Sequence, residues 1–228
     1  MRRRNFPKAK MKRLFNALVK ITGWPVQKIL FRTKVYYEDK AVQSWRLKGP
    51  AILISNHTSV YDYAVFLFVF WRRTLRYQMA ELLFRRRVLK HFLRAMGGIF
   101  VDRDAYDFSF VRRSLEILER KGVVGIFPEA RLPVEGEERP LPFKTSAAYI
   151  ALESGAPVIP VYTNGSYFRK QRAEVIIGKP VFARDLWQDG ADERTNLEAI
   201  SAALREKVIG LGYELETQKQ QNRKKKES

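Results

Sequence analysis

His57 and Asp62 are the residues whose types and spacing first suggest chemistry. His57 lies in an expected turn, and Asp62 follows it in the first turn of the next expected helix. A carboxylate at that place can accept a hydrogen bond from one imidazole nitrogen and leave the other free as a general base. Because histidine titrates near neutral pH, it suits removal of a hydroxyl proton. The spacing also occurs by chance, so a helix cap beside a solvated histidine is the alternative.

The elements expected around this pair alternate between strand and helix. Apolar runs predict strands at residues 51–55, 99–101, 123–127, 158–162 and 174–177. Helical spacing of apolar residues predicts helices at residues 60–71, 80–96, 108–120, 144–154 and 192–211. This order favours an α/β fold with a central sheet flanked by helices. Since sites in such sheets gather past the strand ends, we expect His57, Arg103 and Glu129 to converge there.

Composition narrows the kinds of partner and site. The 228 residues include 46% hydrophobic residues, enough for a sizeable core, and carry a net charge of +19. That charge implies a polyanionic partner, which is nucleic acid, an anionic membrane or a phosphate-rich substrate. The chain has no cysteine and two histidines, which excludes disulfides and thiolate nucleophiles and disfavours a histidine-rich metal site.

The N-terminal segment is basic and amphipathic. It holds eleven lysines or arginines before the first acid, Glu38, with aliphatic and aromatic residues between them. Pro25 is expected to break it into two short helices. Apolar residues at helical spacing favour a membrane-interface arm over residues 1–40 rather than a nucleic-acid arm. No signal peptide or run of about 20 apolar residues is apparent. A domain over residues 41–212 and a disordered basic tail over 213–228 complete the expected organisation.

Four segments in order resemble the motifs of one enzyme family. Residues 56–62 (NHTSVYD) resemble a first motif NHxSxxD, and residues 98–103 (GIFVDR) resemble a second that ends in arginine. Phe127-Pro128-Glu129 begins like a third, FPEGTR, and residues 156–161 resemble a fourth. The family is the lysophosphatidate acyltransferase (1-acyl-sn-glycerol-3-phosphate acyltransferase) family of glycerolipid acyltransferases. The resemblance covers about residues 45 to 182, including a phenylalanine–lysine pair that ends at Lys144.

The resemblance implies a mechanism and partners. His57 is then the general base and Asp62 orients it, while Arg103, Glu129, Arg131 and Lys144 bind substrate. An acceptor hydroxyl attacks the thioester of acyl-CoA or acyl carrier protein directly, without a metal or organic cofactor. The acceptor is lysophosphatidate, and the enzyme lies on the cytoplasmic face of an anionic membrane, with no nucleic acid expected. The alternatives are another lysolipid or glycerol-3-phosphate as acceptor, a serine nucleophile at Ser59, and a non-enzymatic binder of anionic membrane or nucleic acid.

The sequence departs from the family pattern at two places. The third motif reads FPEAR, so Ala130 replaces a glycine and Arg131 comes one position early. The stretch from Met79 to Leu83 lacks a lysine that many relatives carry. Both departures affect the expected acceptor more than the reaction type. Backbone amides past Phe127 or near Thr58 are the alternative sites for stabilising an oxyanion.

Overall fold

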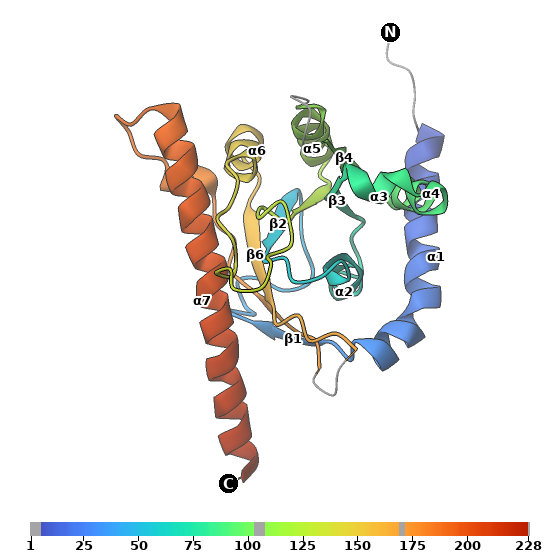
Figure 1. Cartoon of the computed structure of the whole chain (residues 1–228), viewed down its shortest axis with the longest axis vertical. Coiled ribbons are helices and arrows are strands. Elements are labelled where there is room, and N and C mark those ends of the chain that lie inside the picture. Colours follow the sequence, from blue (N-terminus) through green and yellow to red (C-terminus); the bar gives the residue numbers. More distant parts are fainter. Residues whose placement is uncertain (1–5, 103–107, 169–171, 228) are drawn as a thin grey trace.

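The computed structural model describes residues 6–102, 108–168 and 172–227 and has a central β-sheet between layers of helices (Figure 1). The described residues form a seven-stranded sheet in the order β1-β7-β6-β2-β5-β3-β4. Its strands are β1 Lys34–Tyr37, β2 Ala51–Ser55, β3 Leu75–Ala80, β4 Ile99–Val101, β5 Val123–Ile126, β6 Val158–Thr163 and β7 Glu174–Ile177. Neighbouring strands are parallel except for β6 and β7, which are antiparallel. The predicted α/β class is confirmed.

Helices cover both faces of the sheet. They are α1 Phe6–Leu30, α2 Asp62–Val69, α3 Glu81–Arg85, α4 Arg87–Met96, α5 Ser109–Glu119, α6 Ser146–Ser154 and α7 Glu193–Glu227, with a short 3₁₀ helix η1 at Ala183–Leu186. One hydrophobic core joins α2, α3 and α4 to one face, and a second joins α5, α6 and α7 to the other. In β2, Leu53 belongs to the first core, and Ile52 and Ile54 belong to the second. This alternation follows from the two-residue period of a strand.

Strand β3 and the two helices after it differ from the prediction. We expected one helix over residues 80–96, but Leu75–Ala80 form a strand and α3 and α4 are separated at Arg86, whose backbone is extended. The missed signal is an alternation in which Leu75, Tyr77 and Met79 are buried and the residues between them are partly exposed. Pairing of β3 with β5 buries that apolar set and fixes the strand.

The N-terminal arm also differs from the prediction. Pro25 was expected to divide it, yet α1 continues from Phe6 to Leu30 with Pro25 inside it. Figure 1 shows the lower end of α1 turning toward the sheet, which suits a proline bend. Residues 34–37, assigned to the arm, are strand β1 and pair with β7. The folded domain therefore begins before residue 41.

The C-terminal tail is helical where disorder was expected. Helix α7 runs to Glu227, well past the predicted end near Leu211. Leu211 and Leu215 pack in a small core with Tyr36 of β1. Further along, Lys219 forms an ion pair of 2.9 Å with Glu174 of β7. The edge of the sheet therefore supports a helix that its own polar sequence does not predict, and the tail prediction is wrong up to Glu227.

Candidate active site

The turn that carries His57 lies between β2 and α2, at the ends of the parallel strands. Asn56 holds this turn to the end of β6. Its side-chain amide donates to the Thr163 carbonyl, and its side-chain oxygen accepts from the Thr163 amide, both at 2.9 Å. Because Asn56 and Thr163 are both buried, this pair of hydrogen bonds fixes the position of the backbone at His57.

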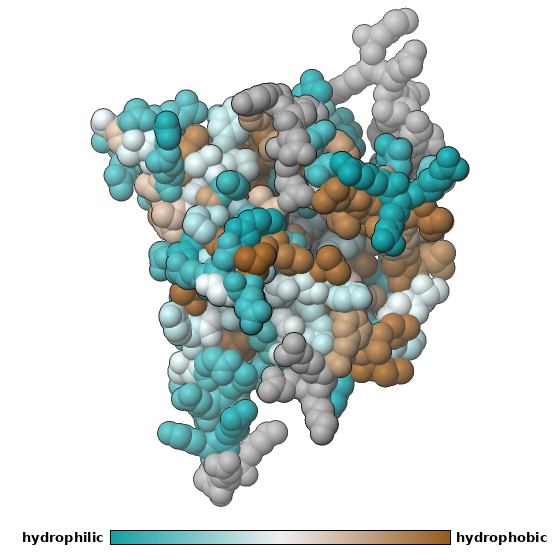
Figure 2. Space-filling model, viewed as in Figure 1, coloured by the Kyte–Doolittle hydropathy of each residue, from teal (hydrophilic) through white to brown (hydrophobic). Residues whose placement is uncertain are grey.

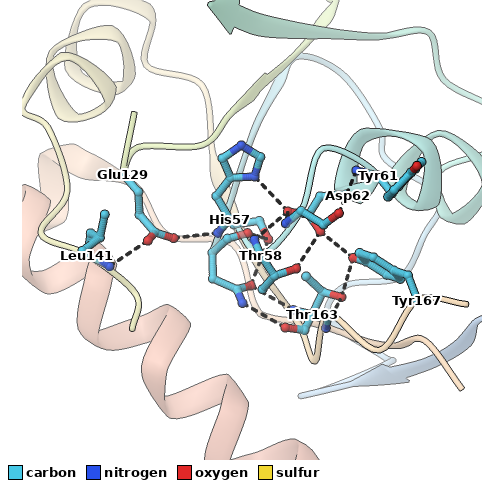
Figure 3. A network of polar contacts seen from close by, with 12 residues as sticks. His57, Thr58, Tyr61, Asp62, Glu129, Leu141, Thr163 and Tyr167 are labelled. Atoms are coloured by element: carbon cyan, nitrogen blue, oxygen red, sulfur yellow. Dashed lines mark hydrogen bonds and ion pairs between the residues drawn. The ribbon is translucent and has the colours of Figure 1, made fainter. Parts of the chain in front are cut away.

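Asp62 is the first residue of α2 and is fully buried, with 0% of its side chain exposed. Its carboxylate accepts the backbone amides of Thr58 and Ser59 at 2.8 and 3.0 Å, as Figure 3 shows for Thr58. The Thr58 hydroxyl donates to the second oxygen at 2.8 Å. Donors from the turn therefore compensate the cost of burying this charge and fix the carboxylate beside His57.

His57 completes the pair with Asp62. Its Nδ1 lies 2.8 Å from Oδ2 of Asp62, so Nδ1–H donates and Nε2 keeps its lone pair (Figure 3). The imidazole stacks on the ring of Phe127, with the centroids 4.2 Å apart and the planes 13° apart. About 18% of the histidine side chain is exposed, and it lines the main cleft. The arrangement is that of a general base oriented by a carboxylate.

Tyr167 is a functional candidate that the sequence did not reveal. It lies in the loop after β6, 105 residues from Asp62, and its hydroxyl donates to Oδ1 of Asp62 at 2.6 Å. The same hydroxyl lies 3.0 Å from the Thr163 hydroxyl. Burial and the neighbouring Asp62 charge raise the pKa of Tyr167, which keeps it a donor. No local pattern pointed to it, because only the fold brings the two residues together.

Glu129 is buried and acts on the backbone. Its two carboxylate oxygens accept the amides of His57 and Leu141, at 2.6 and 2.7 Å. Burial raises the pKa of Glu129, and those two amide bonds oppose the rise. The expected convergence of His57 and Glu129 is thus present. Through these two bonds Glu129 holds the His57 turn and the loop at Leu141 in place.

The remaining predicted substrate-binding residues differ in position. Arg131 is exposed on the cleft wall, and its guanidinium pairs with Glu137 at 2.7 Å. Lys144 is also exposed on the cleft wall, and its amide donates to the Pro128 carbonyl at 2.8 Å. Arg103 lies outside the described residues.

Ala130 shows what the FPEAR departure does to the backbone. Its φ is +62°, in the left-handed region that glycine adopts without strain. Alanine therefore holds this turn at some cost in backbone energy that a glycine would not incur.

Two alternatives from the sequence lose support at the same turn. The amides of His57, Thr58 and Ser59 are engaged by carboxylates, which leaves them unavailable to an oxyanion. The Ser59 hydroxyl accepts the Tyr61 amide at 3.2 Å, and no hydrogen bond joins it to His57 among the described residues. The geometry therefore favours direct use of His57 as a base over a serine nucleophile.

The cleft beside His57 is large and mostly apolar. It has a volume of about 1360 Å³, more than a small-molecule pocket usually offers. Its apolar wall comes from α2, β3, α3, α4, β4 and α5 and includes Tyr63, Met79, Leu83, Leu89, Phe92, Leu93 and Phe110. Polar groups on it include His57, Arg86, Glu129, Arg131 and Lys144. Such a cleft suits a long hydrocarbon chain with an anionic end.

A comparison with protein families agrees with this geometry. The model of the Acyltransferase family matches residues 32–164, which is more than half of the chain and includes both His57 and Asp62. The chain therefore belongs to the Acyltransferase family.

Individual relatives agree. The chain is 28% identical over 153 residues to human 1-acyl-sn-glycerol-3-phosphate acyltransferase beta, which covers 65% of this chain and 54% of the human protein. The chain thus spans about half the length of that curated relative. The crystal structure of the 1-acyl-sn-glycerophosphate (LPA) acyltransferase PlsC from Thermotoga maritima has the same fold, with a TM-score of 0.61 and 20% identity. That likeness covers 93% of this chain and 84% of the PlsC chain.

Proposed function

We propose that this protein transfers a fatty acyl group from acyl-CoA or acyl carrier protein to the sn-2 hydroxyl of 1-acyl-glycerol-3-phosphate. The products are phosphatidate and a free thiol. The observation that carries the proposal is the His57–Asp62 pair, held rigidly on the wall of a large apolar cleft. The printed names of the human and Thermotoga relatives support the choice of acceptor.

The proposed reaction is a direct attack. Nε2 of His57 takes the proton from the sn-2 hydroxyl as its oxygen bonds to the thioester carbonyl carbon. The tetrahedral intermediate then collapses, the carbon–sulfur bond breaks, and the thiolate takes the proton back from His57. Asp62 stabilises the transient imidazolium through Nδ1–H. The step moves one proton and one acyl group, so the proposal requires no metal or organic cofactor.

The acceptor's phosphate is proposed to bind where cations meet the cleft. Arg131 and Lys144 are exposed on its wall, and Arg103 was assigned the same role from the sequence. The Arg131 guanidinium already pairs with Glu137, so we expect a phosphate to compete for it. Glu129 supports this site indirectly, through the backbone at His57 and Leu141.

The test is product identification by mass spectrometry with purified protein. Lysophosphatidate and acyl-CoA should give phosphatidate, and parallel reactions with glycerol-3-phosphate and other lysolipids define the acceptor. A His57→Gln variant, which keeps a polar side chain without a base, serves as the matched control. Turnover by that variant at the wild-type rate would contradict the mechanism. If the wild-type protein acylates another acceptor and does not acylate lysophosphatidate, the assignment of lysophosphatidate as the acceptor is wrong.

We also propose that α1 lies on an anionic membrane, and its two faces are the reason. Three polar side chains of α1 are buried and form hydrogen bonds: Asn16 to the Met96 carbonyl, Lys20 to the Trp71 and Arg73 carbonyls, and Gln27 to the Thr33 hydroxyl. Phe15 is half-buried beside them and packs against Phe92. Large apolar side chains are exposed on the outer face: Leu14 (72%), Leu18 (55%), Ile21 (65%) and Ile29 (73%). A helix on a water-soluble domain buries such side chains, so this exposed apolar face suits a lipid surface.

Figure 2 supports a continuous docking surface, since apolar side chains gather on the side of the molecule where α1 and α4 lie. Val88 and Phe92 of α4 are also exposed. None of the described helices is both long and apolar enough to cross a bilayer. The proposal is therefore attachment to one leaflet. Because the thioester donors are cytoplasmic metabolites, that leaflet is taken to be the cytoplasmic one.

Vesicle sedimentation tests the docking surface. A variant with Leu14→Ser and Leu18→Ser should lose binding to anionic vesicles, because about 1.5–3 kcal/mol of burial is forfeited at each leucine. Ala17→Ser, between them on the same helix, is the matched control. Unchanged vesicle binding by the double variant would rule out this face.

A further inference from the structure

A second group of basic side chains lies away from the His57 cleft, toward the opposite end of the strands. It comprises Lys12 and Arg13 of α1, Arg73 and Arg76 at the start of β3, and Arg113 of α5, here called the edge cluster. Arg76 pairs in register with Val124, near the start of β5. The cleft begins further along β3, at Tyr77 to Ala80. Tyr77 directly follows Arg76, but none of the five residues of the edge cluster lines the cleft.

Contacts on one side bring Arg76 to α1. The stem of Arg76 passes over Gly97, where an added Cβ would lie 3.3 Å from the Arg76 Cγ. The carbonyl of the preceding residue, Met96, accepts the Asn16 side-chain amide at 3.1 Å. The same amide lies 3.3 Å from the Lys12 carbonyl, one helical turn back. Lys12 and Arg76 therefore lie at one junction.

Contacts on the other side bring Arg76 to α5. Gln78 projects from the same face of β3 as Arg76, and its amide donates to the Ser114 hydroxyl at 3.1 Å. Arg113 is the residue before Ser114 on that helix. Three separate elements thus direct cations toward the start of β3.

The charges in this cluster are poorly compensated. Arg113 pairs with Glu116 at 2.7 Å, and Arg73 donates to the carbonyls of Leu47, Gly49 and Lys121. Among the described residues, no acid or carbonyl pairs with Lys12, Arg13 or Arg76. Burial, followed by the charges of Arg113 and Arg13, lowers the pKa of Arg76. Partly buried cations that repel one another destabilise a fold unless an anion lies between them.

We propose that the edge cluster binds the phosphate of an anionic membrane lipid, at a site separate from the catalytic cleft. Guanidinium groups pair with phosphate oxygens in a two-pronged geometry, and Arg13 and Arg76 offer two such groups. A lipid is favoured over a soluble phosphate because Met11 and Leu14, beside Lys12 and Arg13, are exposed by 66% and 72%. These apolar side chains would contact the lipid's chains. The lipid source rests on the proposed membrane docking of α1.

The test measures binding of dihexanoyl phosphatidylglycerol, an anionic lipid that is not the proposed product, and of inorganic phosphate to the full chain by thermal shift. Arg76→Gln is the variant, and Arg194→Gln is the control, since Arg194 is an exposed residue of α7 that loses the same charge. We expect wild type and Arg194→Gln to bind the lipid alike, and Arg76→Gln to bind it at least about tenfold more weakly, the loss of a charge-assisted hydrogen bond. Equal losses of lipid affinity in both variants would mean that the lipid responds to the overall positive charge of the protein, and would refute a specific site at Arg76.

Two further readouts keep the outcomes distinct. Without any anion, Arg76→Gln should melt at a higher temperature than wild type, because repulsion is relieved. A lower melting temperature with unchanged lipid binding would make Arg76 a structural residue and refute the proposal. Inorganic phosphate that matches the lipid in affinity would refute the lipid source. Acyl transfer by wild type in neutral detergent is measured separately, so failure of the proposed function is distinguishable from failure of this site.

Discussion

Replacing Tyr167 with phenylalanine removes one oxygen from the support of the His57–Asp62 pair. That oxygen donates to Oδ1 of Asp62 at 2.6 Å. Asp62 keeps its bonds from Thr58 and Ser59, so the buried carboxylate is not left without donors. The substitution therefore reduces the electrostatic stabilisation of the Asp62 carboxylate and leaves its position nearly unchanged. Tyr167 acts through Asp62 and is a positioning residue.

The size of the effect follows from the type of bond. A hydrogen bond to a charged group contributes about 1.5–3 kcal/mol. With one donor fewer, Asp62 stabilises protonated His57 more strongly. If about half of that energy reaches the imidazole, the acid limb of kcat/KM against pH moves up by about half a unit to one unit, because one unit is equivalent to about 1.4 kcal/mol. The deficit of Tyr167→Phe should then reach about three- to tenfold on the acid side and shrink as pH rises.

The assay is thiol release from acyl-CoA with lysophosphatidate across the pH range, beside Tyr213→Phe as control. Tyr213 is an exposed residue of α7 and loses the same hydroxyl. The control should reproduce the wild-type profile. A Tyr167→Phe profile that is lowered equally at every pH would refute the electrostatic reasoning and reduce Tyr167 to a packing residue.

Three other perturbations have defined outcomes. His57→Ala should lower kcat by about 10²–10⁴ while vesicle sedimentation stays at the wild-type level, and retained turnover would exclude His57 as the base. Ala130→Gly should raise the free energy of unfolding in urea by about 0.5–1 kcal/mol, because φ is +62° there; a loss would mean that the methyl group packs usefully. Burial lowers the pKa of Lys20 to about 8 from 10.5. The folded state then binds fewer protons than the unfolded state, so wild-type stability should rise between about pH 8 and 10.5 relative to Lys20→Met, and parallel curves would contradict this.

Much of the site was predictable because its chemistry is local. His57 and Asp62 are close in the chain, and a turn leading into a helix is enough to bring them together. The convergence of His57 and Glu129 followed from parallel strands ending at one edge of the sheet. Tyr167 was not predictable, because its partner Asp62 is distant in sequence and meets it only when β6 lies beside β2.

The errors in the fold prediction share a physical cause. Strand β3 was missed because its alternation is short and two of its six residues, Arg76 and Gln78, are polar; its pairing with β5 stabilises it. Helix α7 was ended too early because its last turns are polar. Their support comes from contacts with β1 and β7, such as Lys219 with Glu174. In both cases a neighbouring element outweighed local propensity.

The sequence by itself determined the chemistry: a histidine base with its carboxylate, the order of the motifs, and an N-terminal segment that mixes cations with apolar residues. Only the tertiary structure decided the orientation of that segment. Helix α1 turns Asn16, Lys20 and Gln27 toward the protein and leaves Leu14 and Ile21 exposed. The same amphipathic pattern would allow the opposite arrangement. The pattern of polar and apolar residues does not state which face of the helix meets the protein. Hydrogen bonds from those polar side chains to backbone carbonyls and to Thr33 select the observed orientation.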